Sequence, residues 1–583
     1  MNLKPGFAAF LQNNDVPAEF TILEVTESLN ASLHELQKVD AEIQQLLELM
    51  ETVEMRRQRI REVISDHKVI LSPVRRLPPD VLHEIFFHCL PTDRNPVMKH
   101  SESPLLLTRI CHSWRAIALS SPRIWSKVHV PLPGDHTFSE WSYALDYHTV
   151  IKDGHRQSFA DVVRSRCDAI RRWLSRSGAC PLSLSIGHSG DYSSLGIELI
   201  QEMFDMLLSF ADRWRDIDLS IPEDIYNDLL DGINPATFCS LKSLKIALSS
   251  QEFADWEAEP IPIRLLAAPS LRRVTISARQ TSRLTGNLAQ PIWHRITHLT
   301  FTSSTTDKYL LVLLRQCPNL VFGEFMTSFS RWADQTVDKE EAFLPRLETL
   351  AINDFGAREI MTIVFNAIKA PALTRLLYQW FNPPLNSNSS LFLPTPVIPL
   401  LENSALISDL SLSGELSSQH TRECLQRGER VTRVVFGGPP STNVSGHQVS
   451  HSPFMDPDVV IRPDTFDLRI LSIGSGAVTL LPRLEYLEAY HLSRLTDEAL
   501  LDIITSRING FKRGETAALK SLKLSFKRKR QKDITEDVSR LAKEAGIEVK
   551  LDLTYLMEGC KFVEHTPQPL LTSGFSPNND MWY

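Results

Sequence analysis

The sequence lacks the features that mark membrane and secreted proteins. No run approaches the ~18 apolar residues that a helix needs to span a bilayer. The first residues, MNLKPGFAAFLQNND, show neither the charged start nor the long apolar core of a signal peptide. The eight cysteines form no Cys-x-x-Cys pair, which argues against a zinc ribbon or a thioredoxin-type redox motif. We therefore expect no membrane contact and a reducing compartment, either the cytosol or the nucleus.

Recognisable catalytic motifs are also missing from the sequence. It contains no Walker loop, no Gly-x-Gly-x-x-Gly and no His-Glu-x-x-His. Gly187-His188-Ser189-Gly190 is no nucleophile elbow, because that motif needs a glycine where Asp191 stands. His83-Glu84 and Cys111-His112 are isolated pairs in expected helices, where solvated or packed side chains are commoner than metal ligands. The sequence therefore predicts no enzyme, no cofactor and no metal site.

The charge of the chain argues against a nucleic-acid partner. Its 583 residues carry 62 basic and 70 acidic side chains, giving a net charge of −8, and the two signs are intermixed. A nucleic-acid surface would show a basic face instead. One basic run, Lys527-Arg528-Lys529-Arg530 with Lys532, fits either a nuclear import signal or the basic end of a repeat, and we favour the repeat.

Residues 21–70, after a tail over 1–20, predict one long helix because they contain neither glycine nor proline. Apolar residues recur in heptads, and nine of eleven a and d positions are apolar, which is typical of a coiled coil. A helix this long cannot bury its stripe alone, so we expect a partner: a second copy, giving a homodimer, or the protein's own body. The a positions are Leu29, Leu36, Ile43, Met50, Arg57 and Ile64, and the d positions are Ser32, Val39, Leu46, Val53 and Ile60.

Residues 72–130 predict a small helical module. Pro78 and Pro79 suit the start of a helix, since the first N–H groups of a helix have no intrahelical partner. Pro91 ends that helix. A second helix is expected to begin near Ser103-Pro104 and to end before Ser121-Pro122. Apolar residues and two tryptophans follow at helical spacing, so an ordinary helical hairpin with both tryptophans in its core is one interpretation.

The same residues closely resemble an F-box. The motif stands here as Leu77-Pro78-Pro79-Asp80-Val81-Leu82-His83-Glu84-Ile85-Phe86, then Ile110-Cys111-His112-Ser113-Trp114-Arg115-Ala116-Ile117-Ala118, then Pro122-Arg123-Ile124-Trp125. The departures are Ile110 for valine, Ile124 for leucine, and an insertion between Pro91 and Ser103. The match covers roughly a tenth of the chain, in the style of fungal F-box proteins.

The resemblance implies binding to a Skp-type adaptor and, through it, to the core of a cullin ubiquitin ligase. Some matching positions must hold the module together, while the others would contact the adaptor. Carried over from the family, the adaptor-binding positions are Leu77, Pro78, Ile85, Phe86, Leu90, Ile110, Cys111, Trp114 and Trp125.

Residues 179–565, after a linker and helix over 131–178, repeat a unit Leu-x-x-Leu-x-Leu. Copies begin at residues 214, 241, 271, 296, 347, 373, 407, 431, 484 and 519, with a degraded copy at Leu320-Gly323-Phe325. Most intervals up to residue 431 are 24–27 residues, which is the leucine-rich-repeat period. The alternative is a set of unrelated βα units. We expect loops over the inserts at 382–399 and 437–464 and a disordered tail over 566–583.

The fold class is therefore α/β: an all-α N-terminal coiled coil and F-box helices, followed by an irregular leucine-rich-repeat-like solenoid with one parallel strand per repeat. Such solenoids bind through the x positions of their strands. The early copies are basic or neutral there and a later one carries Glu485 and Glu488, so we expect the face to run from positive to negative and to bind an acidic segment of a target protein. The alternative is that these are simply solvated strand residues. The predicted target-binding residues are Lys242, Lys245, Arg272 and Arg273.

Two functions fit these expectations. The first is a substrate-recognition adaptor of an SCF-type (cullin–RING) ubiquitin ligase, which supplies proximity and needs no catalytic residue of its own. The second is a non-catalytic scaffold without ubiquitin transfer. The sequence does not identify the target.

Overall fold

The computed structural model describes residues 7, 9–11, 16–132, 159–187, 197–222, 225–226, 229, 233–249, 263–278, 292–328, 340–355, 358–380, 395–414, 418–437, 467–474 and 479–555. The chain divides into two compact units, Met1–Glu84 and Ile85–Tyr583. The predicted linker after residue 132, the inserts apart from 395–399 and Gly437, and the predicted tail lie outside the described residues. Within the described part, none of the helices has the length and apolar character needed to cross a bilayer.

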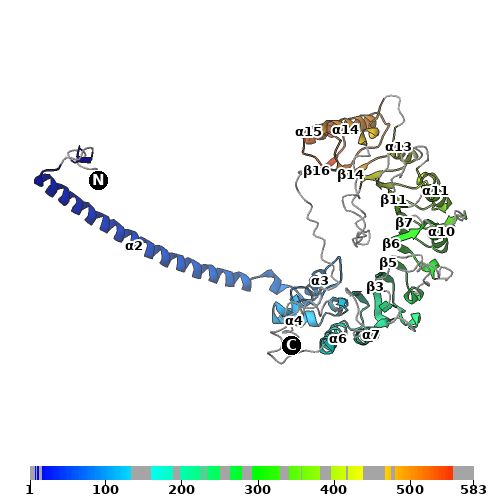
Figure 1. The fold of residues 1–583 in the computed structure, drawn as a ribbon, viewed down its shortest axis with the longest axis horizontal. Coiled ribbons are helices and arrows are strands. Elements are labelled where there is room, and N and C mark those ends of the chain that lie inside the picture. Colours follow the sequence, from blue (N-terminus) through cyan, green and yellow to red (C-terminus); the bar gives the residue numbers. More distant parts are fainter. Residues whose placement is uncertain are drawn as a thin grey trace. The chain divides into compact units, whose positions relative to one another are not determined.

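The first unit is dominated by one helix. α2 (Glu19–Ile70) follows the short 3₁₀-helix η1 (Ala9–Leu11) and precedes η2 (Pro73–Arg76), and Figure 1 shows it uninterrupted. Its 52 residues correspond to about 78 Å at the helical rise. None of them is buried, and the predicted seam is open: Leu36 is 55% exposed, Ile43 50% and Leu46 65%. The helix predicted over 21–70 is thus present, and its apolar seam is not covered within this unit.

A group of short helices follows, made of α3 (Pro79–His88), η3 (Leu106–Arg109), α4 (His112–Leu119) and η4 (Pro122–Trp125). Cys111 caps α4, because its Sγ accepts a hydrogen bond from the N–H of Trp114 over 3.4 Å. Trp114 in turn packs on Phe86, with ring centroids 4.9 Å apart. The first helix therefore begins where Pro78 and Pro79 predict, and the second ends before Ser121-Pro122 as expected. The predicted start of the second helix near Ser103-Pro104 is wrong, because η3 precedes it and α4 begins only at His112.

Fourteen strands of the described residues form one parallel sheet, in which successive strands of the chain lie side by side. Only β8 (Ala342–Phe343) and β10 (Ile368–Lys369) stand apart, as a small parallel pair. The sheet is open and mixed with helices, so the α/β class is confirmed. Its strands are β1 Lys127–Pro131, β2 Leu182–Gly187, β3 Trp214–Pro222, β4 Ser243–Ser249, β5 Arg273–Ala278, β6 His298–Thr306, β7 Phe322–Ser328, β9 Thr349–Phe355, β11 Arg375–Trp380, β12 Asp409–Gly414, β13 Arg433–Phe436, β14 Tyr486–Leu492, β15 Ser521–Phe526 and β16 Lys550–Tyr555.

Helices and 3₁₀ turns connect these strands. Figure 1 shows α7, α10, α11 and α13 on one side of the strands that they join. The helices are α6 Phe159–Arg176, α7 Ile197–Leu208, α10 Asp307–Gln316, α11 Arg358–Ala367, α12 Ile398–Asn403, α13 Ser418–Arg427, α14 Asp497–Lys512 and α15 Thr535–Glu544, and the turns are η5 Ala211–Arg213, η6 Pro235–Thr237, η7 Arg264–Ala267, η9 Trp293–Arg295 and η12 Leu468–Leu471.

The repeats align in register across the sheet. The second apolar residue of each copy pairs with the same position of the next copy, starting with Ile217 opposite Leu244 and Leu244 opposite Val274. Because side chains alternate between the two faces of a strand, this ladder lies on a single face. All its members are buried, and they form the core between sheet and helices. The ladder continues through Leu299, Gly323, Leu350, Leu376, Leu410, Val434, Leu487 and Leu522.

Gly323 explains the degraded copy. A Cβ at this position would lie 2.8 Å from Cε2 of Phe325 and 3.3 Å from Cδ2 of Leu320. The Phe325 ring stacks on Phe301 of the neighbouring strand with centroids 6.1 Å apart. Phe325 therefore fills the space that a leucine takes in the other copies, so the copy is degraded in sequence while the core stays filled.

The short helices are joined to the sheet by buried contacts. Trp125 meets Trp173 of α6 edge-on at 4.9 Å, and Nε1 of Trp173 donates to the carbonyl of Lys127 at the start of β1. The insertion after Pro91 also contributes, since the N–H of His129 in β1 donates to the carbonyl of Pro96 over 2.9 Å. Within the second unit, η4, α6 and the first strand are thus packed together.

Candidate functional site

The short helices leave large apolar side chains open to solvent. Ile85 is 37% exposed, Leu106 42%, Ile110 52% and Leu119 42%. Burying such side chains against a partner contributes roughly 1.5–3 kcal/mol each. This set, which we call the open apolar set, is a candidate surface for docking another protein.

The structure divides the nine predicted adaptor-binding residues into two groups. Phe86, Leu90 and Trp125 are buried, at 0%, 5% and 0% exposure, so they hold the module together. They offer no surface to a partner in this conformation. The remaining six are exposed or half-buried and are free to contact one: Leu77, Pro78, Ile85, Ile110, Cys111 and Trp114.

The contacts of Trp125 explain why this residue stabilises the module and does not contact a partner. Its Nε1 donates to the carbonyl of Ala118 over 2.8 Å, which ties η4 to the end of α4. The guanidinium of Arg176 lies over its ring at 4.8 Å, and Trp173 covers its edge. Every face of the indole is therefore occupied by the chain itself.

Two members of the open apolar set, Leu106 and Leu119, escape the sequence prediction. Leu105, Leu106 and Leu107 form a continuous apolar run, and only Leu107 of the three is buried. Leu106 and Leu107 fall in the 3₁₀-helix η3, whose period differs from the α-helical spacing used for the prediction. Leu119 is the last residue of α4 and directly follows the buried Ala118. That position was the one signal in the sequence that could have predicted its exposure.

The predicted target-binding residues lie on or beside β4 and β5, and two of them form ion pairs. Nζ of Lys245 lies 3.1 Å from Oδ2 of Asp218, and Nη2 of Arg273 lies 3.5 Å from Oδ1 of Asp216. Both aspartates belong to β3, which is next to β4 and two strands away from β5. The positive charge of this part of the sheet is therefore partly neutralised by its neighbour.

Lys242 and Arg272 remain exposed at the start of their strands. Arg272 donates from Nη1 to its neighbouring carbonyl, Leu271, over 2.8 Å. Of the four cations predicted to form a basic surface, these two are the ones without an ion pair described above, so the positive patch is smaller than predicted.

Opposite charges also pair across the later strands. Arg375 lies 3.8 Å from Asp409, Arg433 binds Glu488, and Lys520 lies 2.6 Å from Glu485. Burial favours a higher pKa for Glu488, but hydrogen bonds from Tyr490 and Arg433 outweigh it and lower the pKa. The expected gradient from positive to negative is thus wrong for these residues, because the two signs are interleaved from strand to strand.

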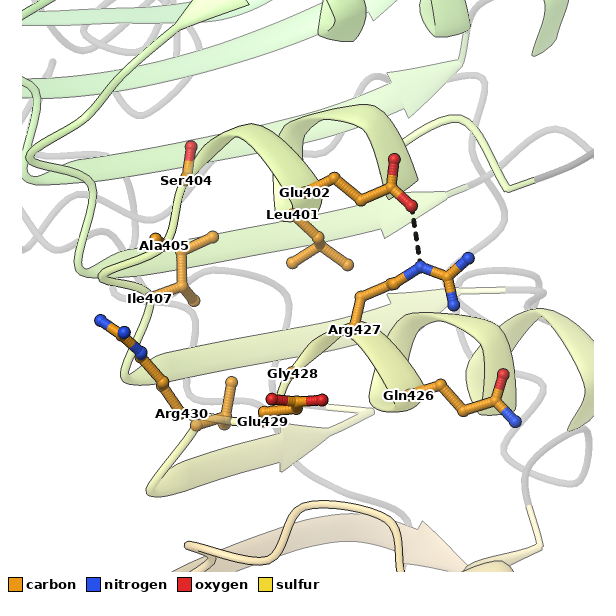
Figure 2. A pocket seen from close by; sticks show the side chains of 11 residues that line it. Leu401, Glu402, Ser404, Ala405, Ile407, Gln426, Arg427, Gly428, Glu429 and Arg430 are labelled. Carbon is orange, nitrogen blue, oxygen red and sulfur yellow. Dashed lines mark hydrogen bonds and ion pairs between the residues drawn. The ribbon is translucent and has the colours of Figure 1, made fainter. Parts of the chain in front are cut away.

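Figure 2 shows the hollow at the ends of α12 and α13, which has a volume of about 240 Å³. Glu402 and Arg427 face each other there, with Nε of Arg427 2.8 Å from Oε1 of Glu402. Both side chains are about half exposed, so the pair contributes at most about 1 kcal/mol. The charged side chains around the hollow are two glutamates and two arginines, and the hollow is a seam between two repeats. Its lining is Leu401, Glu402, Ser404, Ala405, Ile407, Gln426, Arg427, Gly428, Glu429, Arg430 and Val431.

Thiols and possible metal ligands give no chemical site in the described part of the chain. No three His, Cys, Asp or Glu residues there are grouped so that they could hold a metal ion. Burial raises the pKa of Cys167 to about 11 and the pKa values of Cys317 and Cys424 to about 12, so these thiols stay protonated and unreactive at neutral pH.

Comparison of the sequence with known proteins identifies no relative of this chain. A scan against models of protein families finds no match to the chain, and a search of the curated proteins finds none either.

Proposed function

We propose that the chain is a substrate-recognition adaptor of an SCF-type (cullin–RING) ubiquitin ligase. Residues 72–130 would act as an F-box that binds a Skp-type adaptor, and the repeated strands would form a leucine-rich-repeat-like solenoid that holds a target protein. The observation that carries the proposal is the state of two motif positions, Ile85 and Ile110. Both match the F-box pattern in order and spacing, and both are left exposed, at 37% and 52%.

The division of the motif supports this interpretation. An ordinary helical hairpin would bury its apolar positions, whereas here Phe86 and Trp125 are buried while Ile85 and Ile110 are open. A partner that covers the two isoleucines would gain apolar contact without disturbing the packed residues. The rest of the ligase would carry out the covalent step, and this chain would supply proximity between target and enzyme.

The test is a pull-down of a purified Skp-type adaptor by the full chain. Replacing Ile85 and Ile110 with Asp should weaken capture at least tenfold, about 1.4 kcal/mol, because two charges would enter an apolar interface. Phe343→Asp is the matched control, since Phe343 is 63% exposed and lies in β8. Unchanged capture by a double variant that unfolds at the wild-type temperature would refute the proposal.

A second candidate is a scaffold without ubiquitin transfer, and the exposed helix α2 favours it. A helix of 52 residues without a buried side chain is suited to assembling complexes. Co-purification of a cullin with the chain separates the two functions, since only the ligase adaptor requires it.

We further propose the cytosol or the nucleus as the site of action. The seven cysteines within the described residues are all free thiols, as a reducing compartment would keep them. Of the candidate import signal, Arg528 is directed inward to Asp497, which favours the structural interpretation of the basic run.

A further inference from the structure

The open seam of α2 requires a partner, and its residues favour one arrangement. Nine of the eleven predicted seam positions are apolar and 45–65% exposed. The two others are Ser32 and Arg57, which lie 25 positions apart. A matching helix must cover the apolar positions and also accommodate these two polar ones.

A parallel pair in register brings like charges together. At the a position of Arg57, the guanidinium would face Arg57 of the second copy. Beside the seam, g positions contact e positions of the next heptad in a parallel pair. Glu35 would then lie against Asp40, and Arg56 against Arg61. Like-charge contacts of this kind disfavour the parallel arrangement.

An antiparallel pair with full overlap removes these conflicts. When Glu19 of one helix faces Ile70 of the other, each a position faces a d position. Arg57 then faces Ser32, so the two polar positions share one layer. Ile22 faces His67 in the layer nearest the ends. The other layers are apolar on both sides: Leu29 with Ile60, Leu36 with Val53, Ile43 with Leu46, Met50 with Val39, and Ile64 with Val25.

The charges beside the seam agree with this alignment. In an antiparallel pair g positions face g positions, and Glu35 falls opposite Arg56 twice in each dimer. The helix is also polarised, because residues 19–54 carry nine acidic side chains and one lysine, whereas residues 55–70 carry five basic and two acidic ones. Antiparallel pairing therefore sets the acidic part of one helix against the basic end of the other.

We propose that α2 binds α2 of a second copy of this chain as an antiparallel two-stranded coiled coil. The two chains would leave the coiled coil at opposite ends of a rod about 78 Å long. A dimer built in this way would present two copies of the helical module and the sheet, one at each end. The inference does not depend on the function proposed above.

Cysteine cross-linking of the full chain tests the alignment. Leu36 faces Val53 in the antiparallel pair, and each faces itself in the parallel one. Mild oxidation should therefore link a Leu36→Cys chain to a Val53→Cys chain, while neither variant should link to itself. The wild-type chain is the control, because Cys89, Cys111 and Cys239 are exposed. Self-linking of either variant beyond the wild-type background would overturn the antiparallel arrangement.

Charge exchange gives an independent readout with opposite signs for the two arrangements. In the antiparallel dimer, Glu35→Lys and Arg56→Glu should each raise the dissociation constant on the order of tenfold, and the double variant should restore it. In a parallel dimer each single change would relieve a repulsion and tighten binding. Sedimentation equilibrium of the full chain measures the constant. A wild-type chain that stays monomeric at micromolar concentration would overturn dimerisation itself.

Discussion

Arg528 donates a hydrogen bond from Nη2 to Oδ1 of the fully buried Asp497 over 2.6 Å. The same carboxylate accepts hydrogen bonds from the N–H groups of Gln531 and Lys532 and from the hydroxyl of Tyr555. Burial favours a higher pKa for Asp497, but these hydrogen bonds outweigh it and lower the pKa to about 2. One carboxylate thus joins α14, the basic run and the last strand.

This network predicts a loss of stability in acid. Because the folded pKa of about 2 lies below the ordinary value of 3.8, the ionised carboxylate stabilises the fold fully above pH 3.8. Its contribution of roughly 2 kcal/mol disappears as the pH falls from about 4 to about 2. Denaturant unfolding of the wild type and of Asp497→Asn should therefore differ most near pH 7 and converge in acid. A difference that does not change with pH would contradict the assignment.

The basic run predicts unequal roles for adjacent cations. Arg528→Ala should lower the free energy of unfolding by about 3 kcal/mol, because it leaves the buried charge of Asp497 without its ion-pair partner. Lys529→Ala is the matched control, since Lys529 is exposed and its loss should change stability by less than about 0.5 kcal/mol. Thermal unfolding of both variants measures the difference. Equal, small effects would mean that the basic run is merely solvated and has no structural role.

The seam of α2 predicts a change of oligomeric state. Replacing Ile43 and Leu46 with Asp puts charges into the central layer of the coiled coil, which costs several kcal/mol if they stay unpaired. Sedimentation should then show a monomer where the wild type is a dimer. Gln44→Asp with Gln45→Asp is the control, because these neighbours lie outside the seam and should leave the dimer intact.

The sheet predicts a separation of target binding from adaptor binding. Reversing Lys242, Lys245, Arg272 and Arg273 to Glu should abolish capture of an acidic target, while a Skp-type adaptor should still bind. The same reversal of four exposed helix residues, Arg422, Lys512, Arg540 and Lys543, changes the net charge equally and is the control. Affinity purification followed by mass spectrometry measures both interactions. If target capture survives, the binding surface lies elsewhere, and the inserts at 382–399 and 437–464 are the next residues to test.

The repeats were the most predictable part of the fold. An apolar pattern recurring every 24–27 residues locates the strands well, because every copy must fill the same space in the core. Gly323 shows the limit of the pattern. The sequence marks this copy as degraded, whereas the cause is the Phe325 ring, which takes the vacant space through its stack on Phe301.

The candidate sites were less predictable, because they depend on contacts between distant residues. Helical spacing places Ile85, Phe86 and Trp125 in one motif but does not say which of them the body covers. Trp125 is buried by Trp173, and that contact exists only once α6 packs on η4. Likewise, Lys245 reads as a free cation until strand pairing sets it beside Asp218, 27 residues earlier. The sequence pattern thus predicts where a residue lies along a helix or strand. The packing of one element on another decides whether its side chain is exposed and whether its charge is paired.

The insertion between Pro91 and Ser103 has a consequence for the growth of the sheet. β1 is the terminal strand, and the outer edge of a parallel sheet is a template onto which a strand from another molecule can add. At that edge the N–H of His129 donates a hydrogen bond to the carbonyl of Pro96. Val97 and Met98 of the insertion are buried. Arg94 donates two hydrogen bonds to the carboxylate of Glu102, which hold the loop closed. The extra residues thus cover part of the edge strand β1, which disfavours the addition of a strand from another molecule at this end of the sheet.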